Sequence, residues 1–260
     1  MEPHKDLVKG HEFWMLPVEG GIFFMGDEHG DRHKGCRPSH QVRLTDYYIG
    51  KFPVTNALWS AVVNAPNVGL DKSHFGSTLN PYPSNFQGED VPVEQISWYD
   101  VQAFLKKLNN RTEYSRPKGH LYRLPTEAEW EYVARGGKYY EEGYKYAGSD
   151  RLKDVGWFDE NSSKETKPVG LKHPNQLGIF DLSGNVCEWC QDWYEGLYYN
   201  QCKRKGEIEK PNGPSKGTNR VSRGGSWREG EQYTRVAWRT PYGPEFRSDH
   251  LGFRLVLAPQ

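Results

Sequence analysis

Glycine and proline recur so often in this sequence that few stretches remain long enough for a helix. The chain of 260 residues contains 28 glycines and 17 prolines, and only 35% of its residues are hydrophobic. Aromatic residues nevertheless reach 14%, including 9 Trp and 16 Tyr. Because a few rings bury as much area as many aliphatic side chains, this composition predicts a loop-rich globular protein with a largely aromatic core.

Two helices stand out because each begins with a capping box. Ser97 is followed three residues on by Asp100, and Thr126 is followed by Glu129. Weaker patterns predict a short helix at 56–63, strands at 13–18 and 21–26 joined by a turn, strands at 41–49 and 251–257, and a surface loop at 201–219. The sequence contains no repeat or linker, so we expect residues 1–260 to form a single domain of mixed α and β structure.

The charge of the chain is balanced. Lys+Arg and Asp+Glu both total 34, so no overall field attracts nucleic acid or an anionic membrane, and we expect no nucleic-acid partner. No run of about 18 apolar residues occurs, and residues 1–6 lack the basic-then-apolar pattern of a signal peptide. Membrane association would therefore require a lipid anchor or a leader that is missing from this sequence.

Motifs for common enzyme chemistries are absent. The sequence contains no phosphate-binding loop, no G-x-S-x-G and no H-E-x-x-H. Glu127 and Glu131 share a helix face, but acidic residues in the first turns are favoured by the helix dipole alone. Four residues that could bind a metal lie close together in the sequence, His29, His33, Cys36 and His40. They lack the paired short spacings of a metal site, so a solvated loop is the favoured interpretation.

The four cysteines, Cys36, Cys187, Cys190 and Cys202, do not form a disulfide framework for a chain this long. Packed or partly paired thiols are favoured over a zinc site, because Cys187-Glu-Trp-Cys190 is a CxxC pair without a second one. A calcium site is a stronger candidate. Residues 181–188 supply carboxylates and turn carbonyls within eight positions, and a hard cation needs such oxygen ligands.

The segment 223–257 has framework-like ends and an unusual middle. Arg223-Gly-Gly-Ser-Trp227 is predicted to be a tight turn that enters a strand. Between this turn and the last strand, aromatic residues stand among Gly, Pro, Ser and Asp, which is poor core material and typical of contact surfaces. These residues are Trp238, Tyr242, Phe246 and His250.

Segments along nearly the whole chain resemble the sulfatase-modifying factor, or formylglycine-generating enzyme, family. They are Gly20–Gly26, Pro53–Asn56, Ser97–Asp100, Arg123–Glu131, Leu177–Asp181, Gly184–Val186, Glu188-Trp189, Arg223–Trp227 and Leu251–Arg254. The resemblance implies a mixed α+β domain with a C-type-lectin-like fold and few helices. It also implies a structural calcium ion, Ca2+, held by Asp181, Gly184, Val186 and Glu188, partly through backbone carbonyls.

The resemblance fails at the residues of the oxidase chemistry. Oxidase members of the family bind copper through two cysteines after the Gly-Gly-Ser-aromatic motif, because a cuprous ion needs thiolate ligands. No cysteine follows Cys202 in this chain, so we expect no copper and no formylglycine generation. A metal-dependent oxidase or sulfoxide synthase remains the alternative function.

The C-terminal segment is similar to the variable proteins of diversity-generating retroelements, in which mutagenesis randomises positions between fixed framework residues. The framework matches Arg235, Arg239, Pro244 and Arg247. The resemblance implies a variable ligand-binding segment at 223–257. Its contact residues would be Trp238, Thr240, Pro241, Tyr242, Gly243, Glu245, Phe246, Ser248, Asp249 and His250.

The sequence therefore favours a non-catalytic binding protein. Its ligand would be a macromolecule, in particular a protein displayed by another cell or a host. Such ligands are found outside the cell, so we expect this protein at the cell surface or in the extracellular space.

Overall fold

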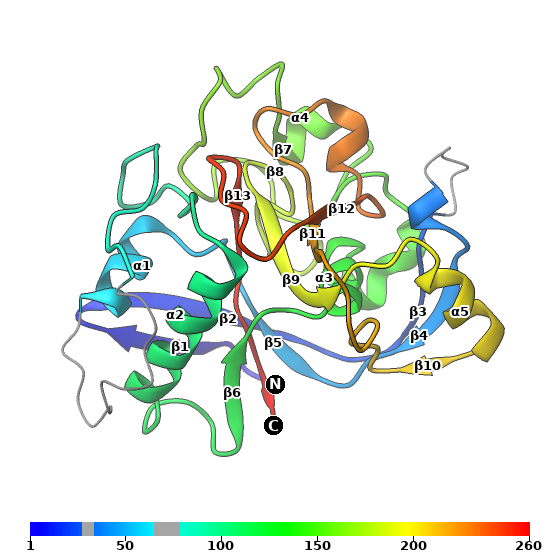
Figure 1. Ribbon diagram of the computed structural model, residues 1–260, viewed down its shortest axis with the longest axis horizontal. Coiled ribbons are helices and arrows are strands. Elements are labelled where there is room, and N and C mark those ends of the chain that lie inside the picture. The colour runs from blue at the N-terminus through cyan, green and yellow to red at the C-terminus, as the bar shows by residue number, and fades with distance from the viewer. Residues whose placement is uncertain (28–33, 65–78) are drawn as a thin grey trace.

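The computed structural model describes residues 1–27, 34–64 and 79–260. Its five-stranded sheet has the order β1-β2-β5-β14-β6, and all neighbouring strands in it are antiparallel. Both ends of the chain belong to this sheet and lie close together (Figure 1). The strands are β1 (His4–Val8), β2 (His11–Val18), β5 (Tyr47–Gly50), β14 (Val256–Pro259) and β6 (His120–Arg123).

A four-stranded sheet carries the segment of functional interest. Its order is β12-β11-β9-β13, and β12 and β13 lie in the upper middle of Figure 1, between the end formed by α1 and α2 and the end formed by α5. Its strands are β12 (Arg239–Tyr242), β11 (Arg220–Arg223), β9 (Cys187–Trp193) and β13 (Leu251–Gly252). Smaller sheets are formed by β3 (Ile22–Met25), β4 (His40–Arg43) and β10 (Ile208–Glu209), and by β7 (Gly156–Trp157) and β8 (Ser183–Gly184).

The helices begin where side-chain caps predict. In α2 (Trp98–Arg111) and α3 (Glu127–Ala134), Ser97 and Thr126 form the expected capping boxes, and Thr55 caps α1 (Asn56–Val63). The remaining helices are α4 (Leu152–Val155) and α5 (Tyr198–Lys205), with 3-10 turns at Lys34–Cys36, Gly137–Glu142 and Glu231–Thr234. In the described part of the chain, no helix is long and apolar enough to cross a membrane.

Aromatic side chains fill the core, as the composition predicts. Trp59 stacks on Phe104 with ring centroids 5.0 Å apart, and Phe253 meets Phe104 edge-on at 5.3 Å. A second cluster surrounds Trp130 of α3. All eight residues of α3 are buried, including three glutamates, so this helix brings carboxylates into the interior.

Several predicted strand boundaries are wrong. The strands at 13–18 and 21–26 do not pair with each other, because β2 lies beside β1 and β5 while β3 pairs with β4. The strand predicted at 41–49 is two strands, β4 and β5, and the strand predicted at 251–257 is divided into β13 and β14.

Two further local predictions need correction. The turn after Arg223 leaves strand β11 rather than entering a strand. The loop predicted at 201–219 begins inside α5, whose Cys202 is buried, and contains β10.

Candidate ligand-binding surface

Strand β12 is fixed from beneath by its arginine, which pairs with a glutamate of α3. Arg239 donates two hydrogen bonds to the carboxylate of Glu127, at 2.5 Å from Nε and 2.8 Å from Nη2, and both side chains are buried. Arg223 of β11 pairs with Glu131, which also accepts a 2.8 Å bond from Arg135. Burial alone would raise the pKa of Glu131, but Arg135 and Arg223 hold it below its usual value. The acidic residues of α3 therefore anchor the sheet, as expected from a structural role.

The loop after β12 is held on the first residues of α2. The backbone N–H of Trp98 donates to the carbonyl of Pro244 at 3.0 Å, and the N–H of Gln95 donates to the carbonyl of Ser248 at 3.0 Å. Arg247 donates to Asp100 at 2.8 Å, the same carboxylate that caps α2. These contacts explain why Pro244 and Arg247 belong to the predicted framework, because they fix the loop backbone without using its other side chains.

Burial alternates between framework and predicted contact positions. Arg235, Val236, Ala237 and Arg239 are buried, whereas Pro241, Glu245 and Phe246 are exposed. Intermediate exposure is found at Trp238, Thr240, Tyr242, Gly243, Ser248 and Asp249. Three residues depart from the pattern. The framework residue Pro244 has intermediate exposure, and the side chain of the framework residue Arg247 is 52% exposed. The predicted contact residue His250 is only 6% exposed.

Three of the four predicted aromatic contact residues form one cluster. Tyr242 and Phe246 stack with ring centroids 4.8 Å apart, and His250 lies 3.1 Å from the Tyr242 hydroxyl through Nε2. His250 supports this cluster from below rather than facing solvent, and burial together with Arg228 lowers its pKa. Its buried position corrects the prediction that it is a surface contact.

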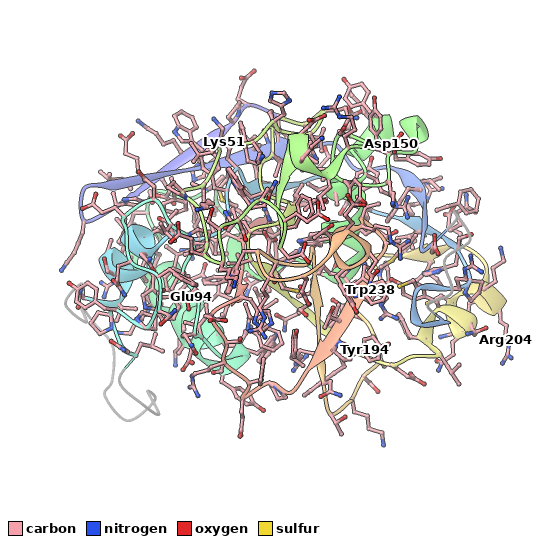
Figure 2. The ribbon with its side chains drawn as sticks, turned by 90° about the horizontal axis from the view of Figure 1, so that it is seen from above. Lys51, Glu94, Asp150, Tyr194, Arg204 and Trp238 are labelled. Carbon is pink, nitrogen blue, oxygen red and sulfur yellow. The ribbon has the colours of Figure 1, made fainter. Side chains whose placement is uncertain are left out.

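Trp238 lies outside this cluster. Its ring meets Tyr233 edge-on at 5.0 Å, and its indole N–H donates to the Thr240 hydroxyl at 3.2 Å. Figure 2 shows Trp238 well apart from Glu94, the residue before Gln95, whose backbone N–H binds Ser248 of the loop. The surface therefore has an aromatic centre at Tyr242 and Phe246 and a separate aromatic position at Trp238.

Glu94 is a buried carboxyl group beneath the loop that no sequence pattern singled out. One of its oxygens accepts a 2.7 Å bond from the Phe86 N–H, and the other has no hydrogen-bond partner. Burial, with a smaller contribution from nearby Asp249, raises its pKa to about 7. The backbone N–H of the next residue, Gln95, donates a hydrogen bond to the carbonyl of Ser248. The Glu94 carboxyl group therefore lies close to the loop of the candidate surface.

Two of the four predicted calcium ligands, Asp181 and Glu188, already accept hydrogen bonds within the protein. Both oxygens of Glu188 accept 2.7 Å bonds from Arg254, and the indole N–H of Trp130 adds a third bond. The guanidinium thus supplies the positive charge that a calcium ion would bring. Asp181 accepts a 2.8 Å bond from the Gly170 N–H, and burial raises its pKa to about 6. Calcium binding stays an untested prediction.

The cysteines do not offer a copper site either. All four are buried, free thiols. Cys187 and Cys190 point from β9 into different core clusters, and burial raises the pKa of both, which disfavours the thiolate that copper requires. Within the described residues, no group of three His, Cys, Asp or Glu side chains is placed to hold a metal ion. His29 and His33 lie outside the described residues.

The fold and this surface define a mixed α and β scaffold of the C-type-lectin-like kind that presents a loop segment from its C-terminal part. The chain belongs to the family of the sulfatase-modifying factor enzyme 1-like domain, whose model matches residues 5–259.

Known relatives include both enzymes and a variable protein. The formylglycine-generating enzyme of Streptomyces coelicolor is 34% identical over 291 residues, which cover 91% of this chain and 87% of that protein. Treponema denticola variable protein 1 has a similar structure, with a TM-score of 0.81, 28% identity and 99% of both chains covered. PvdO from Pseudomonas aeruginosa follows with a TM-score of 0.72, 25% identity and 94% of both chains covered.

The buried ion pair beneath β12 is expected to be essential for stability. Glu127→Gln leaves Arg239 buried without its charge partner, and we expect a loss of about 3–5 kcal/mol in the free energy of unfolding. The matched control Arg247→Ala breaks a half-exposed pair with Asp100 and is expected to cost about 1 kcal/mol or less. Urea denaturation measures both. Equal losses in the two variants would contradict the anchoring role of α3.

Glu94 is expected to make stability fall as the pH rises. Its pKa of about 7 in the folded protein exceeds the ordinary 4.5, so the folded state holds the proton more tightly than the unfolded chain. The stabilising contribution is present below about pH 4.5 and is lost as the pH rises through about 7. We expect Glu94→Gln to match the parent at pH 5 and to be more stable at pH 8, while the exposed control Glu89→Gln shows no such change. A parallel pH profile for all three proteins would exclude this effect.

Proposed function

We propose that this protein is a non-catalytic binding protein whose C-terminal surface recognises a macromolecular ligand, in particular a protein. The observation that carries the proposal is the alternation along β12 and its loop. Buried arginines hold the backbone, whereas Pro241, Glu245 and Phe246 expose their side chains. A surface built in this way tolerates exchange of its contact residues, because the fold does not depend on them.

The similarity to Treponema denticola variable protein 1 supports the same proposal, since it extends over 99% of both chains. We further propose that a diversity-generating retroelement varies the segment 223–257 and that the protein acts at the cell surface or outside the cell. The neighbouring DNA tests the first point. A reverse transcriptase gene and a near-copy of the coding segment that differs at adenines should be present, and their absence would remove the retroelement from the proposal.

Exchange of the exposed residues tests the proposed division between scaffold and surface. A library randomised at Pro241, Glu245 and Phe246 should yield mostly folded variants, because exposed positions each change the free energy of unfolding by about 0.5 kcal/mol or less. Selection of this library against a model protein such as lysozyme should yield binders. A library randomised at Arg223, Arg239 and Arg254 is the matched control and should yield mainly unfolded protein. Equal losses of folded protein in both libraries would overturn the proposal.

The alternative function, a metal-dependent oxidase or sulfoxide synthase, is favoured by the 34% identity to a formylglycine-generating enzyme. Purified protein incubated with cuprous ion and a cysteine-containing sulfatase peptide separates the two functions. We expect no oxygen consumption above the copper-only control, because Cys187 and Cys190 are buried thiols with raised pKa values. Turnover of the peptide would establish the oxidase and refute a purely binding role.

A further inference from the structure

Arg220 lies between two tryptophan rings at the edge of the candidate surface. Its guanidinium carbon is 3.8 Å from the ring centroid of Trp98 and 3.4 Å from that of Trp193. Its Nη1 donates a 2.7 Å hydrogen bond to the backbone carbonyl of Gln191. Two ring faces and one carbonyl thus fix the plane of the guanidinium, so little side-chain entropy remains to be lost when it binds a further group.

The positive charge of Arg220 has no acidic partner. Arg223, Arg239 and Arg254 are each paired with a glutamate, whereas Arg220 forms no ion pair with any residue in the described ranges. Its Nε is buried and has no hydrogen-bond partner. Burial lowers the pKa of Arg220 from its usual value, although Tyr99 and Asp192 act in the opposite direction. A fixed cation with unused donors is the arrangement that binds an anion.

The position of Arg220 connects it to the variable segment. In the antiparallel pairing of β11 with β12, Arg220 lies opposite Tyr242, the centre of the aromatic cluster. The backbone N–H of Trp98 donates a hydrogen bond to Pro244 of the loop. The ring centroid of Trp98 lies 5.7 Å from that of Tyr99, which is 49% exposed. An anion at Arg220 would therefore lie next to whatever ligand covers Tyr242.

We propose that Arg220 is a constant anion-recognition position within the binding surface and that it takes a carboxylate of the protein ligand. The carboxylate accepts a hydrogen bond from Nη2, because Nε is buried and out of a ligand's reach. The rings of Trp98 and Trp193 hold the guanidinium in place. The exchangeable residues around Tyr242 then determine which of the ligands that share an acidic group bind most tightly. This inference rests on the proposed binding function and names the chemistry that its ligands have in common.

Side-chain NMR of the arginine Nε–Hε groups tests the proposal in the intact protein. Two flanking indole rings shift the Arg220 signal away from the others, and its loss in Arg220→Lys assigns it. The probes are acetyl-Gly-Asp-Gly-amide, its Asn counterpart, and acetyl-Gly-Gly-Gly with a free C-terminal carboxylate. We expect a saturable shift with the Asp peptide and none with the Asn peptide. A response to the third peptide decides whether a chain terminus is also accepted.

Two controls make the result decisive. Arg228 and Arg247, which already contact Asp249 and Asp100, should shift little with the same peptides. Arg220→Lys keeps the charge but loses the planar fork, so the Asp peptide should bind about tenfold more weakly or worse, as judged by backbone amide shifts. An equal response to the Asp and Asn peptides, or equal shifts at Arg228, would overturn the proposal.

Failure of this inference can be distinguished from failure of the proposed function. If the protein consumes no oxygen and its surface library folds but Arg220 does not respond to carboxylates, the anion position alone is refuted. If the protein oxidises the sulfatase peptide, the binding function itself is refuted.

Discussion

The structure depends on arginines that are neutralised inside the protein by carboxylates from α3 and β9. Arg239 and Arg223 pair with Glu127 and Glu131, and Arg254 pairs with Glu188, with all six side chains almost completely buried. Burying such charges is costly unless each finds its partner, so only one register of β11, β12 and the C-terminal segment satisfies them all. The pairs therefore favour one arrangement of a chain that has few long helices or strands.

Local signals explain which parts of the fold could be predicted. The capping boxes at Ser97 and Thr126 involve residues three positions apart, so they are visible in the sequence and the structure confirms them. Strand pairing is a long-range property. Gly21 and Leu44 exchange backbone hydrogen bonds at 3.1 and 2.9 Å, which continues the pairing of β3 with β4 by one residue, in a different sheet from β2. The apolar pattern at 41–49 resembles one strand, but residues 44–46 separate β4 from β5, which pair with strands of different sheets.

The site could be predicted only in part for the same reason. Phe246, a predicted contact residue, is exposed, and Arg239, a predicted framework residue, is buried. Arg247, also a predicted framework residue, is half exposed. The resemblance to variable proteins does not show that His250 turns inward to meet Tyr242. Arg220 gave no signal, because its two tryptophans come from α2 and β9 and reach it only in the folded protein. Glu94 resembles any other acidic residue until the loop from Ser84 to Phe86 covers it.

One predicted exchangeable residue couples the candidate surface to the interior through its charge. Asp249, a predicted exchangeable residue, raises the pKa of the buried Glu94, and its backbone carbonyl accepts a 2.9 Å bond from the indole of Trp227. Exchange of the Asp249 side chain leaves the backbone bond in place and changes the charge that Glu94 experiences. A neutral residue there lowers the pKa of Glu94, and a basic residue lowers it further, so that more of the carboxylate is ionised at neutral pH. The identity of residue 249 therefore adjusts the pKa of Glu94, whose largest determinant is burial.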